Sequence, residues 1–180
     1  MSLLPRLANP HLPAESSGDL LAVERLDAEL VRTGLSYWRS LKAGKPFPER
    51  ASMMSCLTPQ MRSQCILLEA QDGGADYECR FVGESVIKGF QADFSGRRLS
   101  SLIEALPKFG LSLRMLCEMA RASGEPLGYR GWVGNDLPGA DFVYHESVLL
   151  PLGGEVGGEA GAVDHLLIVS VLLLRPDQVA

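Results

Sequence analysis

A ten-residue run near the end of the chain constrains the fold more than any other feature. The run HLLIVSVLLL, from His165 to Leu174, is apolar at almost every position instead of at every second one. This length suits a buried strand, whereas a helix that crosses a membrane needs about 20 apolar residues. A strand that is apolar on both sides is buried on both sides. The sheet that holds this strand must therefore be covered on both faces.

Four further stretches predict the rest of the sheet. QCILLEA and YECRFVG are expected to pair as a hairpin, since the adjacent glycines of QDGGAD can adopt the positive backbone dihedrals of a tight turn. PLGYRGWVG and DFVYHESVLLPL follow later, linked by NDLPGA, and the Gly-rich stretch GGEVGGEAGA leads to the last strand. Short links favour antiparallel neighbours. We therefore expect an α+β fold with a five-stranded antiparallel sheet.

Helical patterns separate the second of these strands from the third. They are Glu84–Phe90, GRRLSSLIEAL and KFGLSLRMLCEMARASG. The last is amphipathic, with apolar residues such as Leu116 on one side and charged residues such as Glu118 on the other. Helices inserted at this point cover one face of the sheet. The other face needs a second cover, and the N-terminal part of the chain is expected to supply it.

The composition divides the chain into three parts. Residues 1–18 are rich in Pro, Ser and small polar types and are expected to form a flexible arm. Residues 19–45 carry apolar side chains at spacings of three and four, which predicts one helix of roughly 24 residues and about 36 Å. Gly44 and Pro46 are expected to end it. Residues 46–180 form the predicted domain.

The predicted N-terminal helix is longer than a small domain needs for its own core. Two arrangements follow, and both can hold at once. The helix packs on its own sheet, or it packs on a second copy of the chain in a homodimer. The residues expected at the dimer interface are Leu20, Val23, Leu30, Tyr37 and Trp38.

Charge and targeting signals limit the partners. The formal net charge is −5, and only Arg97 and Arg98 are adjacent among the 17 basic residues, which argues against a nucleic-acid surface. The first residues are interrupted by prolines and lack the apolar run of a secretory signal. No stretch of 18 apolar residues occurs, so we expect no membrane span and a cytoplasmic location.

The four cysteines contain no CxxC pair and are expected to be buried or half-buried free thiols in a reducing compartment. They are Cys56, Cys65, Cys79 and Cys117.

Two blocks of sequence add to the order of the predicted elements. The first block is YWRSLKAGKPFPER, with Tyr37, Trp38, Leu41, Gly44, Pro48 and Arg50. The second is YECRFVGESVIKGFQADFSGRRLSSL, with Arg80, Gly83, Gly89, Asp93, Gly96, Arg97, Leu99 and Leu102. Together with the element order, the blocks resemble a PAS domain over about residues 35–174, and in particular the stand-alone bacterial single-module PAS proteins. The resemblance implies a PAS-like sheet with helices on one face and an N-terminal helix.

The second block has an architectural explanation that we favour over ligand contact. Gly83 lets the second strand leave the sheet, Asp93 caps a turn through its carboxylate, and Gly96 allows a tight bend. Glu84 and the segment CLTPQM depart from the family pattern, next to segments that matter for a ligand or for docking.

No catalytic residue and no metal site is predicted. Residues 84–124 contain no histidine, which argues against haem, and the thioether and thiol groups there are spaced as in a core-facing helix. The cysteine motif of flavin photochemistry is missing from the same segment, which argues against flavin. His145, Glu146 and Asp141 do not converge, because adjacent residues of a strand point to opposite faces. The cofactor is therefore unknown.

Strand alternation indicates a candidate set of ligand-binding residues facing the helices. They pair aromatic bodies with polar tips and are Tyr77, Cys79, Phe81, Tyr129, Tyr144 and Ser170. Such a mixture suits a small organic ligand. The alternative is a filled hydrophobic core with the tyrosine hydroxyls turned to water.

These patterns lead to one main functional hypothesis and two alternatives. The main one is a non-enzymatic PAS sensory or protein-interaction module, which holds a small molecule or nothing and signals through dimerisation or through an unidentified signalling protein. The first alternative is a small enzyme that uses an internal cavity. The second is a ligand-free scaffold or localisation factor.

Overall fold

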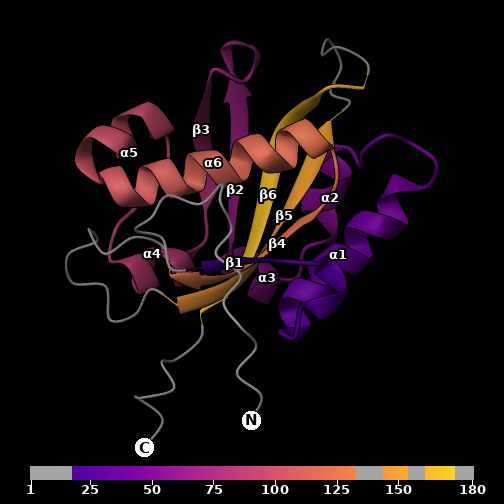
Figure 1. The fold of residues 1–180 in the computed structure, drawn as a ribbon. Coiled ribbons are helices and arrows are strands. Elements are labelled where there is room, and N and C mark those ends of the chain that lie inside the picture. Colours follow the sequence, from indigo (N-terminus) through magenta and orange to yellow (C-terminus); the bar gives the residue numbers. More distant parts are fainter. Residues whose placement is uncertain (1–17, 133–143, 154–160, 173–180) are drawn as a thin grey trace, which may run out of the picture.

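The computed structural model describes residues 18–132, 144–153 and 161–172 of the chain. These residues form an α+β fold in which one antiparallel sheet of six strands lies between helices on its two faces (Figure 1). The strands are β1 (Gly18–Leu21), β2 (Cys65–Gln71), β3 (Asp76–Val82), β4 (Leu127–Trp132), β5 (Tyr144–Gly153) and β6 (Val163–Leu172). Their order across the sheet is β1-β4-β5-β6-β2-β3.

Six α-helices lie within the described residues, and none of them is long and apolar enough to cross a membrane. They are α1 (Glu29–Lys42), α2 (Arg50–Cys56), α3 (Pro59–Ser63), α4 (Glu84–Phe90), α5 (Leu99–Ala105) and α6 (Pro107–Ser123). Two short 3-10 helices, η1 (Val23–Arg25) and η2 (Asp72–Gly74), lie beside them. In Figure 1, α6 crosses one face of the sheet while α1 and α2 lie on its other side.

β6 is buried on both faces, which confirms what its unbroken apolar run predicts. Leu166 and Ile168 pack under α4, α5 and α6. Leu167 and Val169 pack against α1, α2 and α3 on the opposite face. The sheet therefore separates two hydrophobic cores, and β6 contributes to each of them.

The sheet has six strands, so the prediction of five is wrong. The additional strand is β1, which pairs antiparallel with β4 from Gly18 opposite Gly131 to Leu21 opposite Gly128. The first strand residue must be a glycine, because a side chain at Gly18 would overlap the Tyr129 hydroxyl. This close approach lets β1 complete the edge of the sheet. The predicted arm, apart from Gly18, lies outside the described residues.

The single helix predicted over residues 19–45 is also wrong, because α1 begins only at Glu29 and ends at Lys42. The buried carboxylate of Glu146 accepts hydrogen bonds from the backbone N–H groups of Asp27 at 2.9 Å and Ala28 at 2.7 Å. It holds the chain extended just before the helix. At the other end, Ala43 is left-handed with a φ of 35°, one residue before the predicted Gly44 stop. The observed helix of 14 residues is about 21 Å long.

The segment between α1 and the first hairpin contains two short helices. Residues Arg50–Cys56 form α2, which buries Met53. The helix α3 follows Thr58, whose hydroxyl accepts a hydrogen bond from the Met61 N–H at 3.2 Å. Pro59 occupies the first turn, where its missing N–H costs nothing.

The turn chemistry of the second PAS-like block follows the prediction. Asp93 accepts a hydrogen bond from the Ser95 N–H at 2.8 Å, and Gly96 has a φ of 74°. A side chain at Gly83 would overlap the backbone carbonyls of the α3 terminus. The loops NDLPGA and GGEVGGEAGA fall mainly outside the described residues.

Candidate functional site

A small cavity lies in the core between the sheet and the helices α4 and α6. Its volume is about 30 Å³. A buried water needs roughly 10–15 Å³ by the same measure, so about two water molecules fit. The residues that line it are Ile66, Phe90, Phe109, Leu113, Leu116, Tyr129, His145, Ser147, Leu149, Ile168 and Ser170.

Three phenylalanines pack beside this cavity and reduce the space for a ligand. The ring of Phe109 is 5.1 Å from that of Phe94 and 5.5 Å from that of Phe90, between ring centroids. Sites for drug-sized ligands usually measure about 300–1,000 Å³. The packing of this core therefore favours the filled-core alternative over a site for a large cofactor.

A row of polar groups from β5 and β6 reaches the cavity wall. His145 Nδ1 lies 2.5 Å from the Ser147 hydroxyl, which lies 2.8 Å from the Ser170 hydroxyl. The second ring nitrogen, His145 Nε2, is buried and receives no hydrogen bond from any residue that the structure describes. The His145 ring also lies 5.4 Å from the Tyr129 ring, between centroids. The surface that the cavity exposes is nonetheless apolar, and His145 Nε2 is covered by the residues around it.

Burial determines the charge of this histidine. Removal from water disfavours the imidazolium ion and lowers the pKa of His145 from 6.5 to about 4. The ring is therefore neutral at neutral pH, with one nitrogen protonated and the other an acceptor. The neutral ring is therefore part of the buried core.

Two of the six predicted ligand-binding residues line the cavity. They are Tyr129 on β4 and Ser170 on β6. Tyr77 and Cys79 are buried in the same core but lie outside the cavity wall. The Tyr77 hydroxyl is buried without a hydrogen-bond partner among the described residues, and burial raises the pKa of Tyr77 to about 12.

Phe81 faces the opposite side of the sheet, and its predicted place beside the ligand is wrong. Strand β3 has a bulge, because Leu68 pairs with Cys79 while the adjacent Leu67 pairs with Phe81. Arg80 is the extra residue, and it reverses the alternation that follows. Phe81 therefore packs with the core under α1, α2 and α3.

The predicted role of Tyr144 lies outside the described part of the structure, because Tyr144 begins β5 but its side chain is not described. The residues of β5 that line the cavity are His145, Ser147 and Leu149, which the prediction did not include. Alternation distinguishes the two faces of a strand but does not say which one meets the helices.

The cysteines are free and buried or half-buried, as predicted from their spacing. Burial raises the pKa of Cys65 and of Cys79 to about 12, and raises that of Cys117 well above its usual value. These thiols are protonated at neutral pH and act as small apolar side chains.

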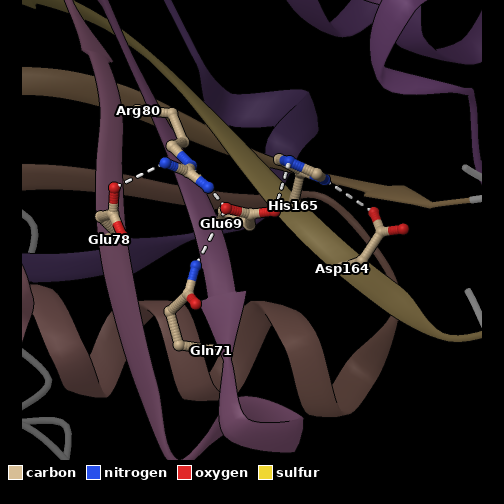
Figure 2. A network of polar contacts seen from close by, with 6 residues as sticks. All are labelled: Glu69, Gln71, Glu78, Arg80, Asp164 and His165. Carbon is tan, nitrogen blue, oxygen red and sulfur yellow. Dashed lines mark hydrogen bonds and ion pairs between the residues drawn. The ribbon is translucent and has the colours of Figure 1, made fainter. Parts of the chain in front are cut away.

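A second polar cluster lies on the sheet face away from α6, where β2, β3 and β6 meet (Figure 2). Arg80 joins two carboxylates, at 2.5 Å from Glu69 and 2.7 Å from Glu78. His165 lies 2.9 Å from Asp164 and 3.8 Å from Glu69.

Burial alone would raise the pKa of Glu69, but the hydrogen bond and charge of Arg80 outweigh it and lower the pKa. The side chain of Arg80 is 49% exposed. The cluster therefore acts as a solvated ion-pair network on the hairpin.

A third polar cluster joins three parts of the chain around the buried side chain of Glu146. Arg130 Nε donates a hydrogen bond to Glu146 Oε2 at 2.8 Å, and Arg130 Nη2 donates to Asp27 at 2.8 Å. Glu146 is 1% exposed and also holds the start of α1. We call Glu146, Arg130 and Asp27 the α1 anchor. The prediction that His145 and Glu146 do not converge is confirmed, since Glu146 belongs to this anchor on the other face.

Trp38 is not available to a dimer interface, which corrects its predicted role. It is 2% exposed, and its indole N–H donates a hydrogen bond to the Pro151 carbonyl of the same chain at 2.6 Å. Leu20 and Val23 lie outside any α-helix, in β1 and η1. Leu30 and Tyr37 remain half-buried on α1.

The described residues contain no group of three or more His, Cys, Asp or Glu side chains arranged to hold a metal ion. Comparison of the chain with protein-family models, with curated proteins and with solved structures finds no match. The functional argument therefore depends on the geometry described above.

Proposed function

We propose that this chain is a non-enzymatic PAS-like sensory or protein-interaction module that acts through a homodimer or a signalling protein partner. The element order supports the proposal: β2 and β3 form a hairpin, α4, α5 and α6 follow, and β4, β5 and β6 complete the sheet. This is the connectivity on which the resemblance to PAS domains depends.

The small size of the cavity is the observation that carries the proposal. An enzyme that used the core would have to bring a substrate to His145, which is 6% exposed beside a cavity of about 30 Å³. A module that presents its outer surface to partners needs no such entrance. The same cavity size favours a ligand-free scaffold as the second candidate function.

The proposed dimer contact is the edge of α1 that carries Leu30 and Tyr37, whose side chains pack partly against the core of their own chain. Leu30 and Tyr37 are seven residues apart, which places them on one side of the helix. Both are half-buried, so each keeps apolar surface that a second copy can cover. Of the residues predicted at the dimer interface, Leu30 and Tyr37 therefore stay in the proposed contact, and Trp38 does not.

Sedimentation equilibrium of the purified chain over a range of concentrations tests this proposal. We expect a dimer whose dissociation constant rises at least about tenfold in Leu30→Glu and in Tyr37→Glu, since a buried charge costs more than 1.4 kcal/mol. Ser36→Glu adds the same charge at an exposed position of α1 and is expected to leave the dimer unchanged. A folded chain that is monomeric at every concentration contradicts the dimer.

A further inference from the structure

One wall of the cavity is a row of three apolar residues across the middle of the sheet. Ile66 on β2 pairs with Ile168 on β6, and Ile168 pairs with Leu149 on β5. All three line the cavity. An isoleucine side chain branches at Cβ and has few rotamers, so the strands hold most of this wall in one arrangement.

The opposite wall comes from the helices. Leu113 and Leu116 of α6 line the cavity together with Phe109 of the same helix and Phe90 of α4. The rings of Phe90 and Phe109 lie 5.5 Å apart, between centroids. Spaces larger than a water molecule are few in a packed core. This space remains because rigid rings on one side face branched side chains on the other.

The surface of the cavity disfavours polar occupants. Nδ1 of His145 lies 2.5 Å from the Ser147 hydroxyl, which lies 2.8 Å from that of Ser170, so these atoms bond with one another. The surface that faces the space is apolar. A buried water needs two to four hydrogen bonds, and an ion would lose its hydration without gaining a counter-charge. The space therefore suits an apolar molecule.

The volume limits the size of that molecule. The cavity of about 30 Å³ corresponds to roughly two water-sized spheres, which matches a diatomic molecule such as dioxygen. Apolar cavities in protein cores stay dry and take up xenon or small hydrocarbons. Such a guest restores the dispersion contacts that the lining atoms lack around an empty space. A larger guest would have to displace the rings of Phe90 and Phe109.

From these observations we infer that the core contains a binding site for one small apolar molecule, of about the size of dioxygen or a xenon atom. The site goes beyond the proposed function, because it requires neither a dimer nor a protein partner. It is also smaller and less polar than the site expected from the sequence, which was expected to bind an organic molecule with polar groups.

Methyl NMR spectra of the full chain under xenon pressure test the inference, with xenon as the probe. We expect the methyl resonances of Ile66, Leu149 and Ile168 to shift with pressure and to approach saturation. Leu167 and Val169 are the internal control, because they pack in the core on the other face of the sheet. Their shifts should be small and linear. Dioxygen is paramagnetic and should shorten the relaxation times of the cavity methyl groups more than those of the control.

Two variants of α6 locate the site. Leu116→Phe fills the cavity and should abolish the saturating shifts. Leu111→Phe adds the same ring on the same helix, where Leu111 is 47% exposed, and should keep them.

Shifts in the wild type that do not saturate, or that are equal in the two cores, would overturn the inference even if Leu116→Phe fails to fold. Saturating shifts that persist unchanged in folded Leu116→Phe would overturn it as well. These measurements do not depend on the dimer, so the site and the proposed interface fail separately.

Discussion

The two cores on either side of the sheet handle buried polar groups in opposite ways. Under α1, α2 and α3, the carboxylate of Glu146 is buried but accepts hydrogen bonds from Arg130 and from two backbone N–H groups. Under α4 and α6, the imidazole of His145 is buried, neutral and bonded on one nitrogen only. In the first core, the charged carboxylate of Glu146 accepts hydrogen bonds on both of its oxygen atoms. The second core leaves one nitrogen of a neutral ring without a hydrogen bond from the described residues, close to a small apolar cavity.

The largest expected effect comes from breaking the α1 anchor. Glu146→Gln leaves the Arg130 guanidinium without its buried partner and weakens the hydrogen bonds that position α1. Removing one partner of a buried ion pair typically costs about 3–5 kcal/mol of unfolding free energy. Urea unfolding followed by circular dichroism measures it. Glu24→Gln, in the exposed pair with Arg39, is the control and should cost less than about 1 kcal/mol.

The next effect is the response of the His145 core to acid. The unfolded chain binds a proton on this ring with a pKa of about 6.5, whereas the folded chain binds it only near 4. The stability contributed by the neutral ring is complete above about pH 6.5 and is lost as the pH falls toward 4, by about 3 kcal/mol in all. Urea unfolding free energies measured between these pH values test this.

His145→Phe should lack this loss between pH 6.5 and 4. The lowered pKa values of Glu69 and Asp76 belong to carboxyl groups, whose contributions are lost at lower pH. A wild-type chain whose stability is flat over the upper window would show that His145 is not held neutral.

Packing should also differ between neighbouring residues of β6. Val169→Phe adds atoms to the anchored core, where the Val169 side chain lies 3.1 Å from the position of a side chain at Gly34. Overpacking a filled core costs about 1–3 kcal/mol. Ile168→Phe points at the cavity, which absorbs part of the added volume, so its cost should be smaller by about 1 kcal/mol. If urea unfolding shows the same loss of unfolding free energy for Val169→Phe and Ile168→Phe, the two cores do not differ in packing as proposed.

The smallest expected effect belongs to the surface network of Figure 2. Arg80→Gln removes the cation between Glu69 and Glu78, but the arginine side chain is half exposed. Exposed ion pairs contribute about 0–1 kcal/mol and weaken as salt screens them. Unfolding in urea at low and at high salt should therefore show a small difference that shrinks with salt. A loss comparable to that of Glu146→Gln would mean that the network is structural.

The elements from β2 onward could be predicted because their signals are local. Glu84–Phe90 is helical over the predicted bounds, and the paired glycines of the hairpin have positive φ values of 70° and 96°. Apolar periodicity and turn glycines depend on neighbouring residues and need no information from distant ones.

The N-terminal segment could not be predicted in the same way, because distant residues decide its conformation. Apolar residues from Leu20 to Leu26 are spaced as in a helix, yet pairing with β4 makes a strand of the first four described residues. The contact between Glu146 and the Asp27 backbone joins positions 119 residues apart. Tertiary contacts of this kind override local propensity.

The candidate site was recovered in part for a related reason. Tyr129 and Ser170 were found because their strands alternate regularly. Phe81 was misplaced by a bulge that no local pattern reveals, and His145 was missed because both faces of β5 carry apolar residues. The available signal was the pattern of polar residues in two apolar strands. His145 and Ser147 are two residues apart in β5, and Ser170 interrupts the apolar run of β6.

The bulge-free strand β4 has a mechanical consequence. Tyr129 lines the cavity on one face of the sheet. The next residue, Arg130, donates a hydrogen bond to the Glu146 carboxylate, which positions α1 on the other face. Successive side chains of a strand point to opposite faces of the sheet. Two adjacent residues of β4 thus contribute to both cores, so a change in the backbone at this point would affect the wall of the cavity and the start of α1 together.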